Sequence, residues 1–357
     1  MCADRYGPRQ TTLAGGLIMS LGAIGFGLAD TYAVAFAARL AVGLGGGLLY
    51  VPILRYAADW FRADEFATVT GLTVATSALG GMLATAPLAV AIEAAGWRLS
   101  VIGLGVIGVL FALLAYRIVD DTPARAGFPD VESDPSDESR QSISDLFSTL
   151  RLVLFDRLTW TIGMIVFCGL GIHYTVVGLW AIPYLVDVYH LPVQRASTLL
   201  LVANVGLLLG SVGIGRLLDH IGRRVDLVLV TGILFASAFA LLGVLGTPPL
   251  TVVGVVLFTE MLLVGGFSLS YTIVKERHAG DVSGTAIGLV NALGYAGSTV
   301  FPILFGWVLD AYWTGELVAG SRTYTVLGYR VAFFVAALVG VIAVGLTLTV
   351  RHTIRRG

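Results

Sequence analysis

The chain has 357 residues, of which 57% are hydrophobic and 13% are charged, and its mean hydropathy is +0.88. A water-soluble domain needs a far more highly charged surface, so this composition excludes a soluble enzyme and predicts a membrane protein. The net charge of −1 carries no information about partners by itself. We expect the chain to lie in a lipid bilayer and to bind no nucleic acid.

Long apolar segments follow one another along the chain. Each is bounded by charged residues, prolines or glycine clusters, and they cover residues 11–30, 32–57, 66–93, 99–118, 158–186, 194–218, 225–246, 248–274, 282–311 and 329–350. Outer-membrane strands are about 10 residues long and alternate in hydropathy, whereas these segments run for about 20 residues without alternation. The sequence therefore predicts an all-α membrane protein with about ten transmembrane helices.

The positive charges predict the orientation of these helices. If the N-terminus is cytoplasmic and every segment crosses once, 17 Arg and Lys residues fall on the cytoplasmic side and 4 on the outer side. Cytoplasmic loops of membrane proteins carry such an excess of positive charge. We therefore expect a multi-pass protein of the plasma membrane with both termini in the cytoplasm.

One connection is strongly acidic. Residues 120–145 contain eight acidic residues, three prolines and five serines, with almost no apolar side chains. Such a segment cannot bury enough surface to fold and is typical of a solvated linker. This predicts an incomplete N-terminal bundle of four spans (1–118), a cytoplasmic linker (119–157) and a C-terminal bundle of six spans (158–357).

A short polar pattern occurs on both sides of the linker. Residues 4–9 read Asp-Arg-Tyr-Gly-Pro-Arg, and residues 219–224 read Asp-His-Ile-Gly-Arg-Arg. Pairing Gly45 with Gly265 also aligns a basic residue that follows each glycine cluster. These matches indicate an internal duplication, and repeated halves joined by a polar linker are typical of secondary transporters.

The second copy extends the pattern further. Residues 215–224 resemble the cytoplasmic motif Gly-x-x-x-Asp-Arg-x-Gly-Arg-Arg of the major facilitator superfamily (MFS) of transporters, and residues 39–45 resemble a second motif of that family. The resemblance implies two helical bundles that rock about a solute site near the bilayer midplane. It also implies a gating latch of carboxylates and arginines at the cytoplasmic face, the alternative being an ordinary positively charged turn. The latch candidates are Asp4, Arg5, Gly7, Arg9, Asp59, Arg62, Asp219, Gly222, Arg223, Arg224 and Glu276.

The chain also departs from the family. Family members have twelve spans, six on each side of the linker, whereas this sequence shows four and then six. Aligning Asp4 with the first copy of the motif leaves the first helix and most of the second outside the chain, and Pro8 replaces a basic residue of the motif. We therefore expect an N-terminally truncated MFS fold.

Three acidic or basic residues lie well inside predicted spans, away from the ends, namely Arg39, His173 and Glu260. A charged side chain in hydrocarbon is costly, so each should face protein or a water-filled cavity and have a partner. They are candidates for recognising a charged solute or for carrying a coupled proton. The alternatives are a structural anchor for Arg39, a static hydrogen bond between helices for Glu260 and simple packing for His173.

Uncharged polar residues also occur in the spans of the second half. They are Tyr174, Asn204, Asn291 and Tyr295. Asn291 and Tyr295 are four residues apart and therefore share one face of a helix. All four are candidates for lining a solute cavity, although polar contacts between helices are the commoner use of such residues.

No motif in the sequence is typical of catalysis. The chain has no phosphate-binding loop that ends in Lys-Ser/Thr and no cluster with metal-ligand spacing, so we expect no enzyme, no metal and no cofactor. The sequence predicts a monomeric secondary active transporter of a small solute that uses alternating access, with proton coupling as a hypothesis. The alternatives are a transporter-like sensor or scaffold, an inactive truncated paralogue, and an intramembrane enzyme. The enzyme is disfavoured because the ionisable residues do not cluster by spacing.

Overall fold

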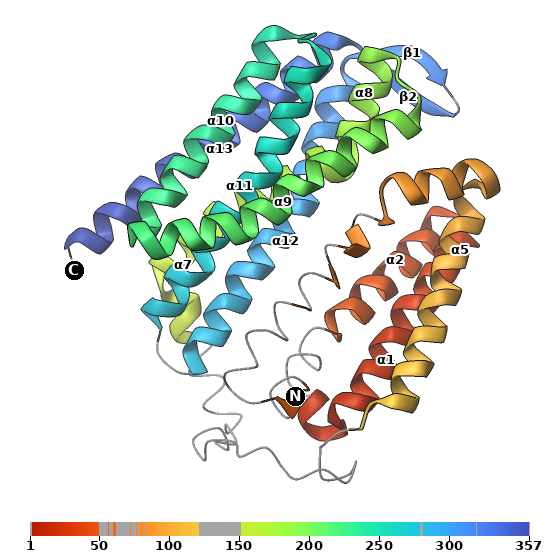
Figure 1. Ribbon diagram of the computed structural model, residues 1–357, viewed down its shortest axis with the longest axis horizontal. Helices are drawn as coiled ribbons and strands as arrows, with labels where there is room; N and C mark the ends of the chain where they lie inside the picture. The colour runs from red at the N-terminus through yellow and green to blue at the C-terminus, as the bar shows by residue number, and fades with distance from the viewer. Residues whose placement is uncertain are drawn as a thin grey trace. The chain divides into compact units, whose positions relative to one another are not determined.

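The computed structural model describes residues 2–49, 83–120, 151–278, 281–318 and 320–356, together with single positions between residues 56 and 81. The chain forms two compact units, Met1–Arg140 and Gln141–Gly357. Each unit is built mainly from long helices (Figure 1).

The first unit contains helices α1 (Cys2–Gly27), α2 (Tyr32–Gly47) and α5 (Ala86–Ile118) among its described residues, and α1 packs against the other two. Gly7, with φ +80°, interrupts α1, and Gly96, with φ +78°, interrupts α5. Only glycine adopts these angles without strain. The first polar hexad therefore lies at a sharp change of chain direction, as a turn between two helices requires.

The second unit contains all six helical segments that the sequence predicts after the linker. The first of these is α7 (Arg157–Thr175), which continues through the π-helical segment η3 (Val176–Trp180) into α8 (Ala181–Tyr189). The others are α9 (Val193–Ile221), α10 (Arg224–Leu245), α11 (Leu250–Arg277), α12 (Asp281–Asp310) and α13 (Val326–Arg356). The first segment has a π-helical interruption, and the helix ends differ from the predicted bounds by up to six residues.

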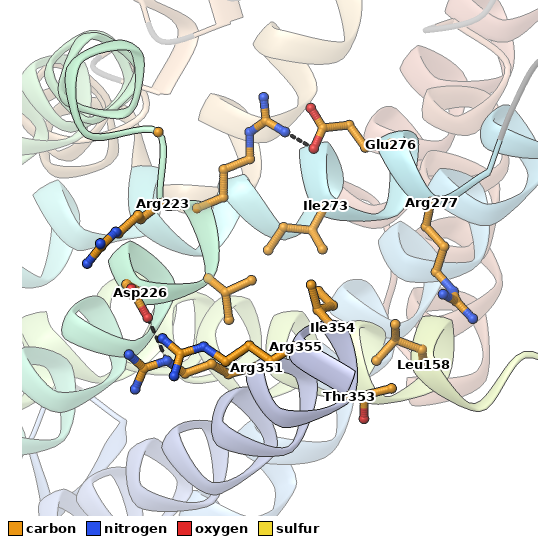
Figure 2. A pocket seen from close by; sticks show the side chains of 13 residues that line it. Leu158, Arg223, Asp226, Ile273, Glu276, Arg277, Arg351, Thr353, Ile354 and Arg355 are labelled. Carbon is orange, nitrogen blue, oxygen red and sulfur yellow. Dashed lines mark ion pairs between the residues drawn. The ribbon is translucent and has the colours of Figure 1, made fainter. Parts of the chain in front are cut away.

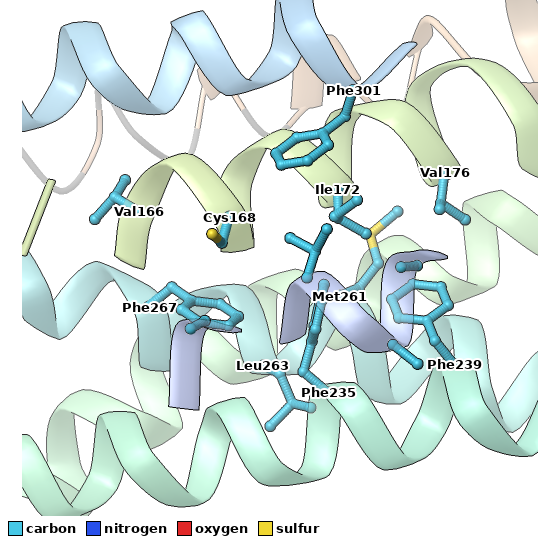
Figure 3. Close-up of a cluster of buried hydrophobic side chains, with 14 of the residues drawn as sticks. Val166, Cys168, Ile172, Val176, Phe235, Phe239, Met261, Leu263, Phe267 and Phe301 are labelled. Carbon is cyan, nitrogen blue, oxygen red and sulfur yellow. The ribbon is translucent and has the colours of Figure 1, made fainter. Parts of the chain in front are cut away.

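Glycines let the helices of the second unit approach closely. A Cβ atom on Gly210 of α9 would overlap the Leu262 carbonyl of α11, and one on Gly297 of α12 would overlap the Phe167 carbonyl of α7. Side chains fill the remaining space between helices. Figure 3 shows part of this core, a cluster of buried apolar side chains to which Phe235, Met261 and the buried Cys168 belong.

A β-hairpin that the sequence did not predict follows α12. Its strands are β1 (Trp313–Val318) and β2 (Ser321–Tyr324), and they pair antiparallel. Asp187 at the end of α8 accepts hydrogen bonds from the Tyr324 amide (3.2 Å) and the Tyr329 hydroxyl (2.7 Å). This carboxylate therefore fixes the hairpin to the helices at the end opposite the C-terminus (Figure 1).

The prediction of a helical membrane protein is confirmed. Seven helices of the described residues are long and apolar enough to cross a membrane. α2 is apolar but has 16 residues, shorter than the predicted span 32–57, whose residues 50–55 lie outside the described residues. Residues 66–71, 73–75, 78 and 82 of the predicted span 66–93 also lie outside them, as do linker residues 121–150. The count of about ten spans therefore stays a prediction.

We expect Gly210→Ala to lower the thermal midpoint of unfolding in detergent by about 3–10 °C, because the added methyl group forces α9 and α11 apart. Gly213→Ala is the matched control on the same helix, since nothing lies within 4 Å of its added Cβ. Equal midpoints for the two variants would show that the α9–α11 backbone contact does not limit stability.

Candidate functional site

Two of the three predicted intramembrane ionisable residues meet in the second unit. His173 on α7 and Glu260 on α11 are 8% and 0% exposed, respectively. The distance from His173 Nδ1 is 3.0 Å to Glu260 Oε1 and 3.2 Å to Oε2. His173 and Glu260 do not cluster by spacing, since they lie 87 positions apart, but the packing of α7 against α11 brings them together.

This geometry allows the pair to exist in two states that differ by one proton. With the carboxylate ionised, Nδ1–H donates to it, and a second proton on Nε2 makes the pair an ion pair of zero net charge. Without that second proton the pair carries one negative charge. A net charge is costly in a low-dielectric interior, so a charged pair needs polar groups or water close to it.

A polar face of tyrosines and an asparagine lies beside the buried pair. The Tyr174 ring contacts the His173 ring edge-to-face, with centroids 5.2 Å apart, and stacks on Tyr295 of α12 at 6.1 Å. The Tyr271 hydroxyl of α11 donates to Asn291 Oδ1 of α12 at 3.1 Å. Tyr174 and Tyr295 are 42% and 54% exposed. Three helices therefore present polar groups, exposed on α7 and α12 and half-buried on α11, on one face of the unit.

The other predicted polar positions have simpler surroundings. The Asn204 amide donates to the Leu200 carbonyl of its own helix at 2.8 Å. Arg39 is exposed on α2, and its guanidinium lies 5.7 Å from the centroid of the Phe26 ring. Among the described residues Arg39 has no carboxylate partner. A partner for Arg39 therefore stays a prediction.

The second hexad forms the turn between α9 and α10. Gly222 adopts φ +66°, and Arg224 at the start of α10 forms an ion pair with Glu276 at the end of α11. Arg223 is exposed. The structure therefore brings together one arginine of the hexad and one predicted carboxylate partner, both within the second unit.

The first hexad has a different set of contacts. Arg9 Nε donates to the Tyr116 carbonyl at 2.8 Å, and Arg9 Nη1 lies 3.4 Å from Asp120 Oδ1. The side chains of Asp4, Arg5 and Asp219 lie outside the described residues, as do residues Asp59 and Arg62. The role of these residues as a latch stays a prediction.

Sequence reasoning missed the most connected carboxylate of this end of the second unit. Asp156 caps α7 by accepting from the Thr159 amide at 3.1 Å, and it accepts Arg277 Nε and Nη2 at 2.9 and 3.0 Å. His278 Nε2 lies 2.8 Å from the Thr159 hydroxyl and 3.3 Å from the same carboxylate. The sequence signal was an Asp directly before an apolar helix, which is a strong N-cap.

The surroundings of Asp156 favour its charged form. Burial of the carboxylate opposes ionisation, but the hydrogen bonds from Arg277 and Thr159 outweigh this effect and lower the pKa of Asp156 well below its ordinary value. The ionised carboxylate therefore joins the start of α7 to the end of α11.

Asp156→Asn should lower the thermal midpoint of unfolding by about 3–8 °C at pH 7, because the amide cannot pair with Arg277. Because the folded-state pKa is lowered, the stabilisation is fully present above the unfolded pKa of about 4 and is lost as the pH falls below it. The difference in thermal midpoint between wild type and variant should therefore stay constant from pH 7 to about 4 and then narrow.

The control for this variant is Asp310→Asn, because Asp310 pairs with Arg322 at 2.9 Å with both side chains about half exposed. Exposed pairs contribute little to stability, so its midpoint should be unchanged. A gap that widens in acid would contradict the assigned charge state of Asp156.

The chain matches the Major Facilitator Superfamily over residues 1–302 and again over residues 206–356. It is 24% identical to the hexuronate transporter of Bacillus subtilis, over 95% of this chain and 82% of the relative. It is 26% identical to the sialic acid transporter NanX of Escherichia coli, over 88% and 74%.

A similar fold occurs in a bacterial homologue of the human lysosomal transporter Spinster. The TM-score is 0.72 at 17% identity, over 99% of this chain and 85% of that one. The fold and the match along the whole sequence lead to the same conclusion: the chain belongs to the Major Facilitator Superfamily and is a multi-pass membrane transporter.

Proposed function

We propose that this transporter moves an organic anion together with a proton, and that the His173–Glu260 pair carries the proton. The observation that carries the proposal is a fully buried carboxylate at 3.0 Å from a nearly buried imidazole. Buried ionisable groups in membrane-spanning helices are costly and usually mark solute or proton pathways.

The coupling follows from electrostatics. An anion that binds near the pair favours the protonated pair, because the pair then has no net charge to repel it. By linkage, protonation of the pair favours anion binding by the same factor. Release of the anion and exposure of the pair to water favour release of the proton. The pair can thus load and unload a proton in step with the solute.

The anionic solute is supported by the names of the relatives. Hexuronates and sialic acids are carboxylated sugars, and the transporters named for them align with most of this chain. Arg39 is the intramembrane cation that we propose for the carboxylate, because guanidinium groups bind carboxylates through two parallel hydrogen bonds. Named transporters as relatives also favour transport over a sensor or scaffold.

The polar face of the second unit is the proposed wall of the solute cavity. Tyr174, Tyr271, Asn291 and Tyr295 present hydroxyl and amide groups that lipid cannot satisfy, so this face should meet water or solute. A hydroxyl-rich solute such as a sugar acid can hydrogen-bond to these groups and stack on the tyrosine rings. We propose no such role for Asn204, because its amide bonds to its own helix.

The distribution of charge in the second unit supports the proposed orientation. Arg224, Arg277 and Arg351 lie at the end that carries the C-terminus, whereas Arg322 lies on the hairpin at the other end (Figure 1). We place the arginine-rich end in the cytoplasm by the positive-inside rule. The Arg224–Glu276 pair is then the part of the proposed cytoplasmic latch that lies within this unit.

Glu260→Gln should abolish proton-driven accumulation of a labelled sugar acid, such as glucuronate, in proteoliposomes. The amide cannot release a proton, so exchange of internal for external solute should continue while net uptake stops. Glu316→Gln is the matched control, because Glu316 lies exposed on the hairpin. If a pH gradient never alters the flux of the wild-type protein, proton coupling is wrong.

Asn291→Ala should raise the KM for the transported sugar acid by about threefold to tenfold, because this is the loss of affinity expected when one hydrogen bond is removed. The maximal rate should stay nearly unchanged. Asn204→Ala should leave both values unchanged and serves as the control. Equal effects of the two variants would contradict the assignment of the polar face to the cavity wall.

A further inference from the structure

A pocket of about 620 Å³ lies at the C-terminal end of the second unit, away from the buried pair (Figure 2). It is enclosed by the beginnings of α7 and α10 and by the ends of α11 and α13. All its walls belong to the second unit.

The lining of the pocket is strongly basic. Five arginines line it, against two acidic residues: the arginines are Arg223, Arg224, Arg277, Arg351 and Arg355, and the acids are Asp226 and Glu276. This concentration of guanidinium groups produces a positive potential inside the pocket.

Three of the arginines are already neutralised. Arg224 pairs with Glu276, Arg351 Nε lies 2.8 Å from Asp226 Oδ1, and Arg277 pairs with Asp156 outside the pocket. Arg223 and Arg355 have no acidic partner in the part of the chain that the structure describes. These two arginines therefore keep their charge available for a ligand.

The three ion pairs also hold the shape of the pocket. They join α10 to α11, α10 to α13 and α7 to α11, so a ligand does not need to order these elements on binding.

Apolar side chains form the centre of the pocket. Figure 2 shows Ile273 and Ile354 at its centre, with the arginines around them, and Leu158 also lines it. A fully hydrated small anion gains nothing from such a surface. A ligand that has a negative headgroup attached to an apolar body matches both parts of the lining.

We propose that this pocket binds the phosphate group of an anionic phospholipid, with Arg223 and Arg355 as its direct ligands and Ile273 and Ile354 in contact with the glycerol backbone and first methylenes. Basic pockets between helix ends on the cytoplasmic side are suited to anionic headgroups. The site is separate from the proposed solute cavity and depends only on the cytoplasmic placement of this end.

The proposal can be tested on the purified full chain in neutral detergent. Short-chain phosphatidylglycerol, short-chain phosphatidylcholine and inorganic phosphate are titrated separately, and binding is measured by calorimetry and by the shift in thermal midpoint. The test variant is Arg223→Gln with Arg355→Gln. The control variant is Arg157→Gln with Arg356→Gln, which removes two exposed arginines at the same end of the unit but outside the pocket.

Phosphatidylglycerol should bind the wild type and the control equally, and the dissociation constant should rise by about tenfold or more in the test variant. Phosphatidylcholine should not bind measurably. Inorganic phosphate that binds as tightly as the lipid, with the same loss in the test variant, would overturn the lipid as occupant. Equal losses in the two variants, or no binding of phosphatidylglycerol to the wild type, would overturn the pocket as a phosphate site.

Discussion

Close approach of helix backbones is the constraint on which the second unit depends. Apolar side chains gain little by leaving lipid for protein, so membrane helices associate through tight packing and buried polar contacts. Gly210 brings α9 against α11, and Gly297 brings α12 against α7. The helices of the buried pair approach in the same way, since a Cβ atom on Gly169 of α7 would overlap the Phe267 ring of α11.

Sequence reasoning located the helices of the second unit well because apolar length alone defines a span, without reference to the rest of the fold. It named His173 and Glu260 separately but could not pair them, since spacing along the chain does not say which helices are neighbours. It missed Asp156, whose importance comes from Arg277, a residue 121 positions away. It also missed the hairpin, because β1 and β2 are short strands with no clear alternation, their side chains all exposed in β1 and half-buried at the end of β2.

The charged residues at the C-terminal end of the second unit form one connected layer. Asp156 caps α7 and pairs with Arg277 at the end of α11. Glu276 of α11 pairs with Arg224 at the start of α10, and Asp226 of α10 pairs with Arg351 at the end of α13. The hexad is thus one part of a chain of ion pairs through four helices. A movement that separates Arg224 from Glu276 would leave the other two ion pairs intact, so the layer can open at one place while the rest of it stays connected.

The π-helical segment η3 rotates the side chains of the second part of the first span about the helix axis, relative to those of the first part. A π turn contains one residue more than an α turn, and each residue of an α-helix turns the chain by about 100°. His173 lies before the extra residue, and Tyr184, which packs against Tyr329 and Phe333, lies after it. The side chains at the two ends of the span can therefore pack against different neighbouring helices. Deletion of a single residue between 176 and 180 would restore a regular helix and yet turn Tyr184 out of its aromatic contacts.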